Sequence, residues 1–505
     1  MTKQEVFTYL SGYYAEAMRK EYAATIGKLA KTKYNKELQG YGKTDKKYQS
    51  WRENNLWTVF DKVMCGGKER LILADKGGRC LYAYTGKWWE RIDTDNFIKE
   101  LVKRTFRLLD VGIMYLASCD RIAKELLSTI KSSDEYLFKP SKRYIAFQNG
   151  VYDLKATDSS GRFKAFNPKY MTDLVLDFEY KREDDCKREF PDVCKRWDNF
   201  VFGENGVFRN PDVAKDIQMF CGALLLDRHE VKFEYMACIF GPGSNGKSVF
   251  VDAIMGVFGR QYCSTFTPAQ LFKEGTNSSF CVSDLEGKIV NVVGDLDNKD
   301  FSGGSFKRLI SGEPIMAREP YGRKNRPVEP PLMICCTNDM PEAKDDSHGH
   351  HRRILPFEST RKMWTEKDKD PNLTAKLTTI QSRQYIFNWI VKGHRRIMSS
   401  PDNNIPWSES TLKVQERFKD NANSMRKWWK DSYYDVPENT FDGEWKSLAE
   451  LYEEYKAYCD VCFYDKRKRN ELSAMLRSKG ATEKRMRTGL HFLVGRKKIE
   501  NENNE

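Results

Sequence analysis

A glycine-rich stretch between two apolar runs carries the most specific chemical signal in the sequence. The segment Phe233–Phe240 is typical of a buried strand, and GPGSNGKS follows it directly before the helical pattern VFVDAIMGVFG. Glycines in such a loop let backbone N–H groups turn toward phosphate oxygens, and the next helix adds its positive N-terminal end. We therefore expect a bound nucleotide to contact Gly241, Pro242, Gly243, Ser244, Asn245, Gly246, Lys247, Ser248 and Val249.

Four polar side chains have distinct expected roles around such a nucleotide. Lys247 would reach the β- and γ-phosphates, and the hydroxyl of Ser248 would ligate Mg²⁺. The run KIVNVVGDLD predicts a buried strand that ends at Asp295 and Asp297. We assign Asp295 to the Mg²⁺ shell and Asp297 to water activation, although the two roles are interchangeable. The alternative interpretation is a strand followed by an Asp-rich turn.

Two later motifs complete the predicted site. LMICC predicts another buried strand, and Asn338 follows it, where an amide can contact the γ-phosphate or the attacking water. The motif HRRILPF then has Arg352 and Arg353 directly before a further strand. These arginines are either surface charges or a finger that reaches the nucleotide of a neighbouring subunit and neutralises transition-state charge.

The bulk composition fits an ordinary soluble protein. The chain has 505 residues, 40% of them hydrophobic and 31% charged, and its length predicts about three domains of ~150 residues. Neither a membrane-spanning apolar run nor a secretory signal is evident, so we expect a cytoplasmic protein without a membrane partner. The net charge of +13 favours a polyanionic partner, although charge alone is weak evidence.

Apolar periodicity predicts the elements around these motifs. Two hairpins are expected, one in CLYAYTGKWWERI around Gly86 and one in RYIAFQNGVYDL around Asn149–Gly150. The charged residues 180–196 predict a domain boundary, and GLHFLVG predicts a C-terminal strand. Helices are expected at residues 95–109, 122–130, 212–226, 375–398, 412–433, 448–459 and 469–479.

Taken in order, GPGSNGKS, VVGDLDN, CCTND and HRRILPF resemble the superfamily 3 helicases, and specifically the phage, plasmid and poxvirus-type primase–helicase family. Residues 305–319, the phrase AFQNGVYDL and the basic C-terminal end also resemble that family. The resemblance implies an α/β fold with an AAA+-like P-loop core of parallel strands. It implies an N-terminal α+β domain at 1–200, the ATPase core at 201–375, a helical segment at 376–435, a basic winged-helix-like domain at 436–498 and a disordered tail at 499–505.

The same resemblance implies an activity. Family members are ATP- and Mg²⁺-dependent helicases that replicate phages, plasmids and other mobile elements, and they move along single-stranded DNA as hexameric rings. The resemblance makes Arg353, or else Arg352, the finger. Asp297 stands where the family often has Glu, and this shorter side chain bears on the hydrolysis rate rather than on binding. The DNA-contacting hairpin would span Ile315–Pro330, with Tyr321, Arg323, Lys324 and Arg326 at its tip.

The N-terminal region has no predicted primase or nuclease site. The first histidine of the chain is His229, so residues 1–228 lack the histidines that primases of the archaeo-eukaryotic kind and rolling-circle initiators use. Asp93 and Asp95 are typical of a helix cap. We therefore expect a separate primase and polymerase as partners at the replication fork. The main alternative is a ring-forming ATPase that binds an origin or assembles replication proteins without processive unwinding. The basic C-terminal end predicts either duplex binding or a solvated face.

Overall fold

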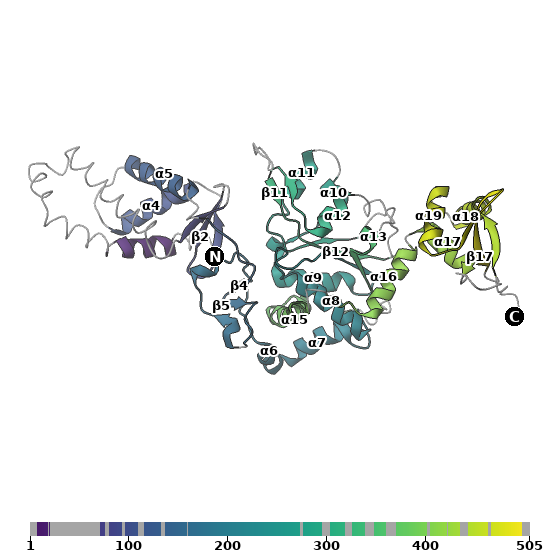
Figure 1. Ribbon diagram of the computed structural model, residues 1–505. Coiled ribbons are helices and arrows are strands. Elements are labelled where there is room, and N and C mark those ends of the chain that lie inside the picture. The colour runs from purple at the N-terminus through teal and green to yellow at the C-terminus, as the bar shows by residue number, and fades with distance from the viewer. Residues whose placement is uncertain are drawn as a thin grey trace, which may run out of the picture. The chain divides into compact units, whose positions relative to one another are not determined.

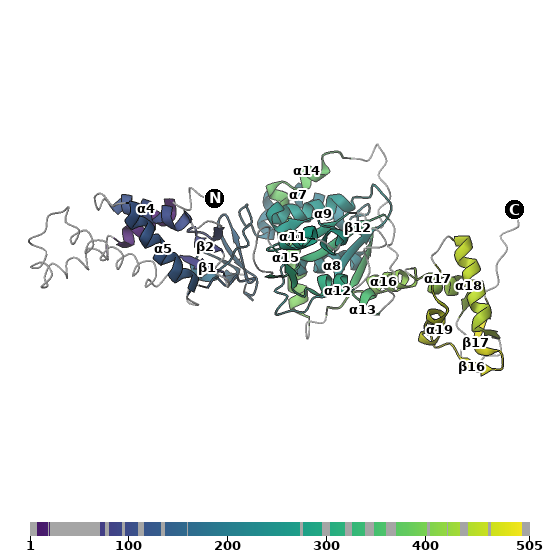
Figure 2. The ribbon, with the colours of Figure 1, turned by 90° about the horizontal axis from the view of Figure 1, so that it is seen from above.

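The computed structural model divides into two compact units, Met1–Tyr180 and Lys181–Glu505 (Figures 1 and 2). The predicted cap at Asp93 and Asp95 and the predicted tail at 499–505 lie outside the described residues. The structure describes residues 8–18, 20, 71–75, 80–92, 96–109, 116–132, 137–158, 160–272, 276–294, 304–318, 326–338, 348–359, 370–400, 405–421, 423–434, 443–462 and 466–496.

The first unit contains a three-stranded antiparallel sheet with helices packed against it. The sheet consists of β1 (Ile72–Ala74), β2 (Leu81–Tyr84) and β3 (Trp89–Ile92), and the helices are α4 (Asn96–Leu109) and α5 (Leu116–Ser132). Side chains from all five elements share one apolar core, which explains why these short elements hold together. The predicted hairpin around Gly86 is confirmed, because this glycine has a φ of 95° between β2 and β3.

A second antiparallel sheet in this unit contains β4 (Tyr144–Phe147), β5 (Gly150–Asp153) and β6 (Phe163–Lys164), with short 3₁₀ turns at Ser160–Arg162 and Pro168–Tyr170. The predicted hairpin forms, but its turn lies one residue earlier than predicted, because Phe147 pairs with Gly150. The side chain of Asn149 explains the shift. Its Nδ2 donates to the Tyr180 carbonyl at 3.0 Å and its Oδ1 accepts from the Tyr180 N–H at 2.8 Å.

Asp153 at the end of β5 is a buried carboxylate with two cationic partners. Arg143 donates to both of its oxygens at 2.7 Å, and Lys164 donates at 2.7 Å. Burial by itself raises the pKa of the Asp153 carboxyl, but the hydrogen bonds from Arg143 and Lys164 outweigh it and lower the pKa to about 2. The carboxylate therefore joins β5 to β6 and to the residue directly before β4.

The second unit is built on five parallel strands. They are β7 (Met236–Phe240), β8 (Cys263–Ser264), β9 (Val290–Val293), β12 (Leu332–Thr337) and β13 (Ile354–Glu358), in the order β13-β7-β12-β9-β8. Every pair is parallel, and the strands are mostly buried, as their continuous apolar sequences predict. The predicted α/β fold with a parallel sheet is confirmed, although β7 begins at Met236 rather than at Phe233.

Helices cover both faces of this sheet (Figure 1). One face packs against α11 (Thr276–Ser283) and α12 (Gly304–Ser311) in a single apolar cluster, with α10 (Pro268–Phe272) contributing Leu271. On the other side, α8 (Pro211–Ala223) and α15 (Ile380–Met398) approach so closely that a Cβ at Gly393 would lie 1.9 Å from the Gln218 carbonyl oxygen. The remaining elements of this part are α9 (Lys247–Phe258), α13 (His348–His351), α14 (Leu373–Leu377) and the 3₁₀ turn Arg260–Tyr262.

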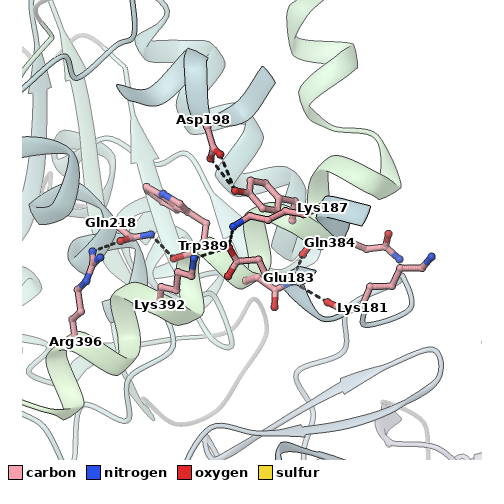
Figure 3. Close-up of polar contacts among 11 residues, drawn as sticks. Lys181, Glu183, Lys187, Asp198, Gln218, Gln384, Trp389, Lys392 and Arg396 are labelled. Atoms are coloured by element: carbon pink, nitrogen blue, oxygen red, sulfur yellow. Dashed lines mark hydrogen bonds and ion pairs between the residues drawn. The ribbon is translucent and has the colours of Figure 1, made fainter. Parts of the chain in front are cut away.

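A polar network fastens the beginning of the second unit to α15 (Figure 3). Here α6 (Glu183–Glu189) and α7 (Pro191–Phe202) lie against that helix. Glu183 pairs with Lys187 and Lys392 at 2.6 Å each, and the Tyr385 hydroxyl donates to Asp198 at 2.9 Å. Burial raises the pKa of the Asp198 carboxyl despite that hydrogen bond.

The C-terminal part of the second unit has an apolar core of its own. Its long last strand, β17 (Gly489–Arg496), pairs antiparallel with three others. The predicted helices at 448–459 and 469–479 and the predicted final strand are confirmed. The predicted helix at 412–433 is divided near residue 422, and the one predicted at 375–398 is divided into α14 and α15. The elements of the C-terminal part are α16 (Glu409–Asn421), α17 (Ser424–Ser432), β14 (Tyr433–Tyr434), β15 (Glu444–Ser447), α18 (Leu448–Cys462), α19 (Arg469–Ser478) and β16 (Glu483–Met486). Within the described residues, none of the helices has the length and apolar character required to cross a membrane.

The Asp153 cluster leads to a prediction about acid stability. The pKa of the folded carboxyl lies below its ordinary value of 3.8, so the stabilisation is complete above pH 3.8 and disappears as the pH falls through 2. We expect Asp153→Asn to lower the free energy of unfolding by about 1–2 kcal/mol at neutral pH, with Arg143 and Lys164 left partly solvated. Urea titrations should show this difference shrinking below pH 4. Asp158→Asn, which changes an exposed carboxylate, is the control, and an equal loss at pH 7 and pH 2 would contradict the assignment.

Candidate nucleotide-binding site

The backbone between β7 and α9 forms a tight loop. Gly241 and Gly246 have φ values of 145° and 91°, and Ser244, with a φ of 57°, is one of few described non-glycine residues with positive φ. A Cβ at Gly241 would lie 2.8 Å from the Ser359 carbonyl oxygen, and one at Gly246 would lie 3.1 Å from Phe200. Gly241 is therefore required for space as well as for conformation, and Gly246 is favoured chiefly by its positive φ.

Lys247, the first residue of α9, turns its side chain back into this loop. Its Nζ donates to the carbonyl oxygens of Gly241 at 2.6 Å and Pro242 at 3.0 Å, and to Oδ1 of Asn245 at 3.0 Å. The side chain is largely buried, with an exposed fraction of 6% for the residue. An ammonium held among carbonyl oxygens inside a loop of turned amides is positioned to meet an anion there.

Asn338 joins the loop from the next strand of the sheet. It follows β12, whose last residue Thr337 pairs with Phe240 at the end of β7. Its carbonyl oxygen accepts from the Gly241 N–H at 3.3 Å, and its side-chain Oδ1 lies 3.5 Å from Nζ of Lys247. The structure therefore brings together two of the predicted site residues that lie far apart in the sequence.

The loop has further features that fit a phosphate ligand. The first turn of α9 has no side-chain cap, so its N–H groups remain available to an anion. In the described part of the chain, Nδ2 of the buried Asn245 has no hydrogen-bond partner, and this buried donor suits a phosphate oxygen. Ser248 is exposed beside it and Val249 is half-buried.

The strand that precedes the predicted acidic pair, β9, belongs to the same sheet. β9 pairs with β12 and ends at Val293, and the description stops at Gly294. Asp295 and Asp297 lie outside the described residues, so their roles stay predictions. Among the residues that the structure does describe, His, Cys, Asp and Glu form no cluster suited to a metal ion.

Arg352 and Arg353 lie on the opposite side of the sheet from the glycine-rich loop, at the amino ends of the strands. They precede β13, whose first residue pairs with Met236 at the beginning of β7, whereas the glycine-rich loop follows the end of β7. At about 3.3 Å per residue, the length of β7 separates the two places by about 16 Å. Both arginines pair with Glu234, Arg352 at 3.0 Å and Arg353 at 3.7 Å. The side chain of Arg352 is 49% exposed and that of Arg353 is 13% exposed.

The predicted hairpin at Ile315–Pro330 is confirmed. It consists of β10 (Ile315–Ala317) and β11 (Arg326–Val328), which pair antiparallel before β12. Arg326 lies in the stem and not at the tip, because it pairs with Ala317 across the hairpin. Its residue is only 7% exposed, and its guanidinium pairs with Glu286 and donates to Ser283 at 3.1 Å. Tyr321, Arg323 and Lys324 lie outside the described residues.

Glu234 is the residue of this region that the sequence interpretation missed. It stands in KFEYMACIF, directly before the buried part of β7. A carboxylate beside the start of a buried strand is a usable signal, since it needs a cationic partner. That partner could not be identified without knowing that β13 is the neighbour of β7.

Comparisons with known proteins identify two matching protein families. Residues 15–203 match the family described as D5 N terminal like, and residues 239–353 match a family of unknown function, DUF5906. No curated protein matches the chain. Among solved structures, the apo structure of the NrS-1 C-terminal region is 11% identical with a TM-score of 0.39, and an A-form apo structure of the same region is 11% identical with a TM-score of 0.38. Each alignment covers 84% of this chain and 96% of the other.

The two family matches adjoin the elements already described. The first extends through most of the described part of the first unit and into α7, and the second runs from β7 through the glycine-rich loop to Arg353. The residues that carry the resemblance to primase–helicases lie almost entirely inside these matched ranges. The chain belongs to the phage-type primase–helicase family.

Proposed function

We propose that this chain is an ATP-dependent superfamily 3 DNA helicase that moves along single-stranded DNA during replication of a phage, plasmid or other mobile element. The observation that carries the proposal is the meeting of Lys247 and Asn338 inside the glycine-rich loop. Their juxtaposition gives the loop a cation for the phosphates and an amide for the γ-phosphate or the attacking water.

ATP and Mg²⁺ fit the residues of this edge. The ammonium of Lys247 would exchange loop carbonyl oxygens for β- and γ-phosphate oxygens, while the N–H groups of the loop and of α9 hold the remaining phosphate charge. Mg²⁺, held by Ser248 and Asp295, would neutralise charge that develops on the phosphates. Asp297 would orient the attacking water, and its exchange of roles with Asp295 stays open.

The order of the strands supports an AAA+-like core. Because β12 lies between β7 and β9, its end emerges between the glycine-rich loop and the segment that continues to the aspartates. A γ-phosphate bound in the loop would therefore face Asn338, with the acidic pair beyond Asn338 on the same side of the loop. A simple surface turn with a glycine-rich sequence would not require this arrangement.

The position of the arginine pair supports hydrolysis shared between subunits. Within one protomer, Arg352 lies at the edge of the sheet opposite to the loop, so it would act on the nucleotide of a neighbour in a hexameric ring. We assign the finger to Arg352, because its half-exposed side chain has one described ion pair. Arg353 is largely buried, with its Nε donating to Ser311 at 2.9 Å, and it would position the finger instead.

DNA contacts would come from two places on the second unit. The β10–β11 hairpin would present Tyr321, Arg323 and Lys324 to single-stranded DNA, while Arg326 anchors the stem. The order β15-α18-α19-β16-β17 supports a winged-helix-like domain for duplex or fork binding. Its exposed basic residues include Lys466, Lys468, Arg469, Lys484, Arg485 and Arg487. A ring-forming platform that does not unwind DNA would use the same ATPase site, and strand displacement separates the two functions.

The first test concerns the loop lysine. We expect Lys247→Ala to reduce ATP hydrolysis to background, because the variant removes the only loop side chain proposed to contact the phosphates as a cation. Steady-state phosphate release measures the effect, and Lys215→Ala, on the exposed side of α8, is the matched control. Hydrolysis by Lys247→Ala at the wild-type rate would rule out this site.

The second test separates unwinding from hydrolysis. Lys324→Ala should lose strand displacement, because a cation at the hairpin tip would no longer engage the phosphate backbone. A forked-duplex assay measures unwinding, and ATP hydrolysis without DNA is measured on the same preparation to verify that the variant is folded. Normal strand displacement by Lys324→Ala would show that the hairpin tip does not contact DNA in the way proposed.

The third test asks whether Arg352 acts between subunits. Arg352→Ala should lower kcat for ATP hydrolysis by about 10³-fold, at the lower end of the range for an arginine finger. Mixing it with Lys247→Ala should restore part of the activity, because some interfaces then combine an intact loop with an intact finger. Arg188→Ala, which removes an exposed arginine paired with Asp185, is the control. If the mixture stays inactive while the variants co-assemble, action between subunits is excluded.

A further inference from the structure

Glu234 is a carboxylate with more cationic partners than one charge requires. Lys232 pairs with it at 3.2 Å, Arg352 at 3.0 Å and Arg353 at 3.7 Å, and its side chain is 17% exposed. These four side chains and Tyr235 line a cavity of about 190 Å³. Any anion that draws Arg352 away from Glu234 will therefore change the balance of charge around the remaining cations.

Arg353 connects this carboxylate to the helix that leads into the hairpin. Its Nε donates to Oγ of Ser311, the last residue of α12, at 2.9 Å. The backbone there forms a helix C-terminal cap, in which Gly312 has a φ of 73° and the Glu313 N–H donates to the Arg308 carbonyl at 3.1 Å. β10 begins at Ile315, so Ser311 lies four positions before the hairpin.

Arg228 holds the same junction from the other side. Its guanidinium donates to the carbonyl oxygens of Ile310 at 2.7 Å, Pro330 at 3.1 Å and Phe233 at 3.0 Å. Ile310 precedes the hairpin and Pro330 follows it, so one side chain ties both of its ends to the chain next to Glu234. Burial lowers the pKa of Arg228 to about 10, so the group stays cationic at neutral pH.

Gly312 leaves the space that this arginine occupies. A Cβ at Gly312 would lie 2.3 Å from Cζ of Arg228, closer than any side chain could be accommodated. The buried guanidinium therefore lies directly against the turn after α12. The base of the hairpin is therefore fixed to the segment 228–234 by polar contacts at both of its ends.

We infer that Glu234, Arg353 and Ser311 form a link, anchored by Arg228, that passes the nucleotide state of a neighbouring subunit to the DNA hairpin. The inference rests on the proposed function and names how its two sites are coupled. When Arg352 leaves Glu234 for a neighbour's triphosphate, the carboxylate loses its nearest guanidinium partner. Arg353, 3.7 Å away, is then drawn toward Glu234 and away from Ser311, which changes the contact that holds the end of α12.

The simplest other interpretation is that these ion pairs only hold the edge of the sheet together. A purely structural role would make hydrolysis, DNA binding and stability fall together when a contact is removed. A coupling role affects the response of hydrolysis to DNA, while each activity by itself persists. The hydroxyl of Ser311 is the best place to distinguish the two, because it contributes one hydrogen bond and little buried apolar surface.

The experiment compares full-length variants for ATP hydrolysis with and without single-stranded DNA, and for ATP consumed per base pair unwound. In Ser311→Ala, we expect stimulation by DNA to fall about fivefold or more, the lower end of typical coupling between sites, with basal hydrolysis retained. Ser311→Thr keeps an acceptor for Arg353 and should retain stimulation. Glu234→Gln removes the charge that draws Arg353 and should lose stimulation as Ser311→Ala does.

Ser399→Ala is the control, because Ser399 is the capping residue directly after α15, and its hydroxyl contacts only that helix among the described residues. Wild-type stimulation and stoichiometry in Ser311→Ala would overturn the link. Equal loss in Ser311→Ala and Ser311→Thr would overturn it as well, since the hydroxyl would then not be the relevant group. A wild-type chain that hydrolyses no ATP at all would instead contradict the proposed function, which is a separate outcome.

Discussion

The parallel direction of the five strands is the constraint on which the rest of the second unit depends. Parallel strands have all their carboxyl ends on the same side of the sheet. The glycine-rich loop and Asn338 therefore lie close together there, although their strands are far apart in the sequence. The same direction places Glu234, the arginine pair and the base of the hairpin on the other side. In the proposed ring, each subunit would therefore hold its phosphate-binding groups and its arginine pair at opposite ends of these strands, so neighbouring subunits would present unlike surfaces to each other.

The local parts of this arrangement could be predicted from the sequence. Buried parallel strands are continuous apolar runs, so β9, β12 and β13 were predicted nearly to the residue, and the glycine-rich loop has a pattern that lies within eight positions. The hairpin β10–β11 was also predicted correctly, but from the resemblance to superfamily 3 helicases and not from the types of its turn residues. The predicted strand was too long at Phe233–Tyr235, where aromatic residues flank Glu234, because β13 pairs with β7 only from Met236 onward.

The errors have one physical origin, which is tertiary contact between segments far apart in the chain. Arg326 was predicted at the hairpin tip because basic residues surround it, but α11 supplies Ser283 and the following turn supplies Glu286, and these partners bury it. The turn after β4 moved by one residue because Asn149 bonds the backbone of Tyr180, 31 positions away. Sequence propensity depends on a residue and its near neighbours in the chain. It could not identify the partners of Arg326 and Asn149, which are distant in the sequence.

Two adjacent arginines can serve different purposes because strand direction gives them different surroundings. Arg353 is adjacent to Ile354 and lies against the end of α12, so its guanidinium finds Ser311 and loses most of its exposure to water. Arg352 is half-exposed, so water competes with its described partner Glu234 for its guanidinium. An exposed ion pair of this kind is worth about 0–1 kcal/mol, so a triphosphate can replace Glu234 at little cost. Moving the buried guanidinium of Arg353 costs more free energy, because its contacts are shielded from water. This difference would allow Arg352 to respond to an anion and Arg353 to transmit the response.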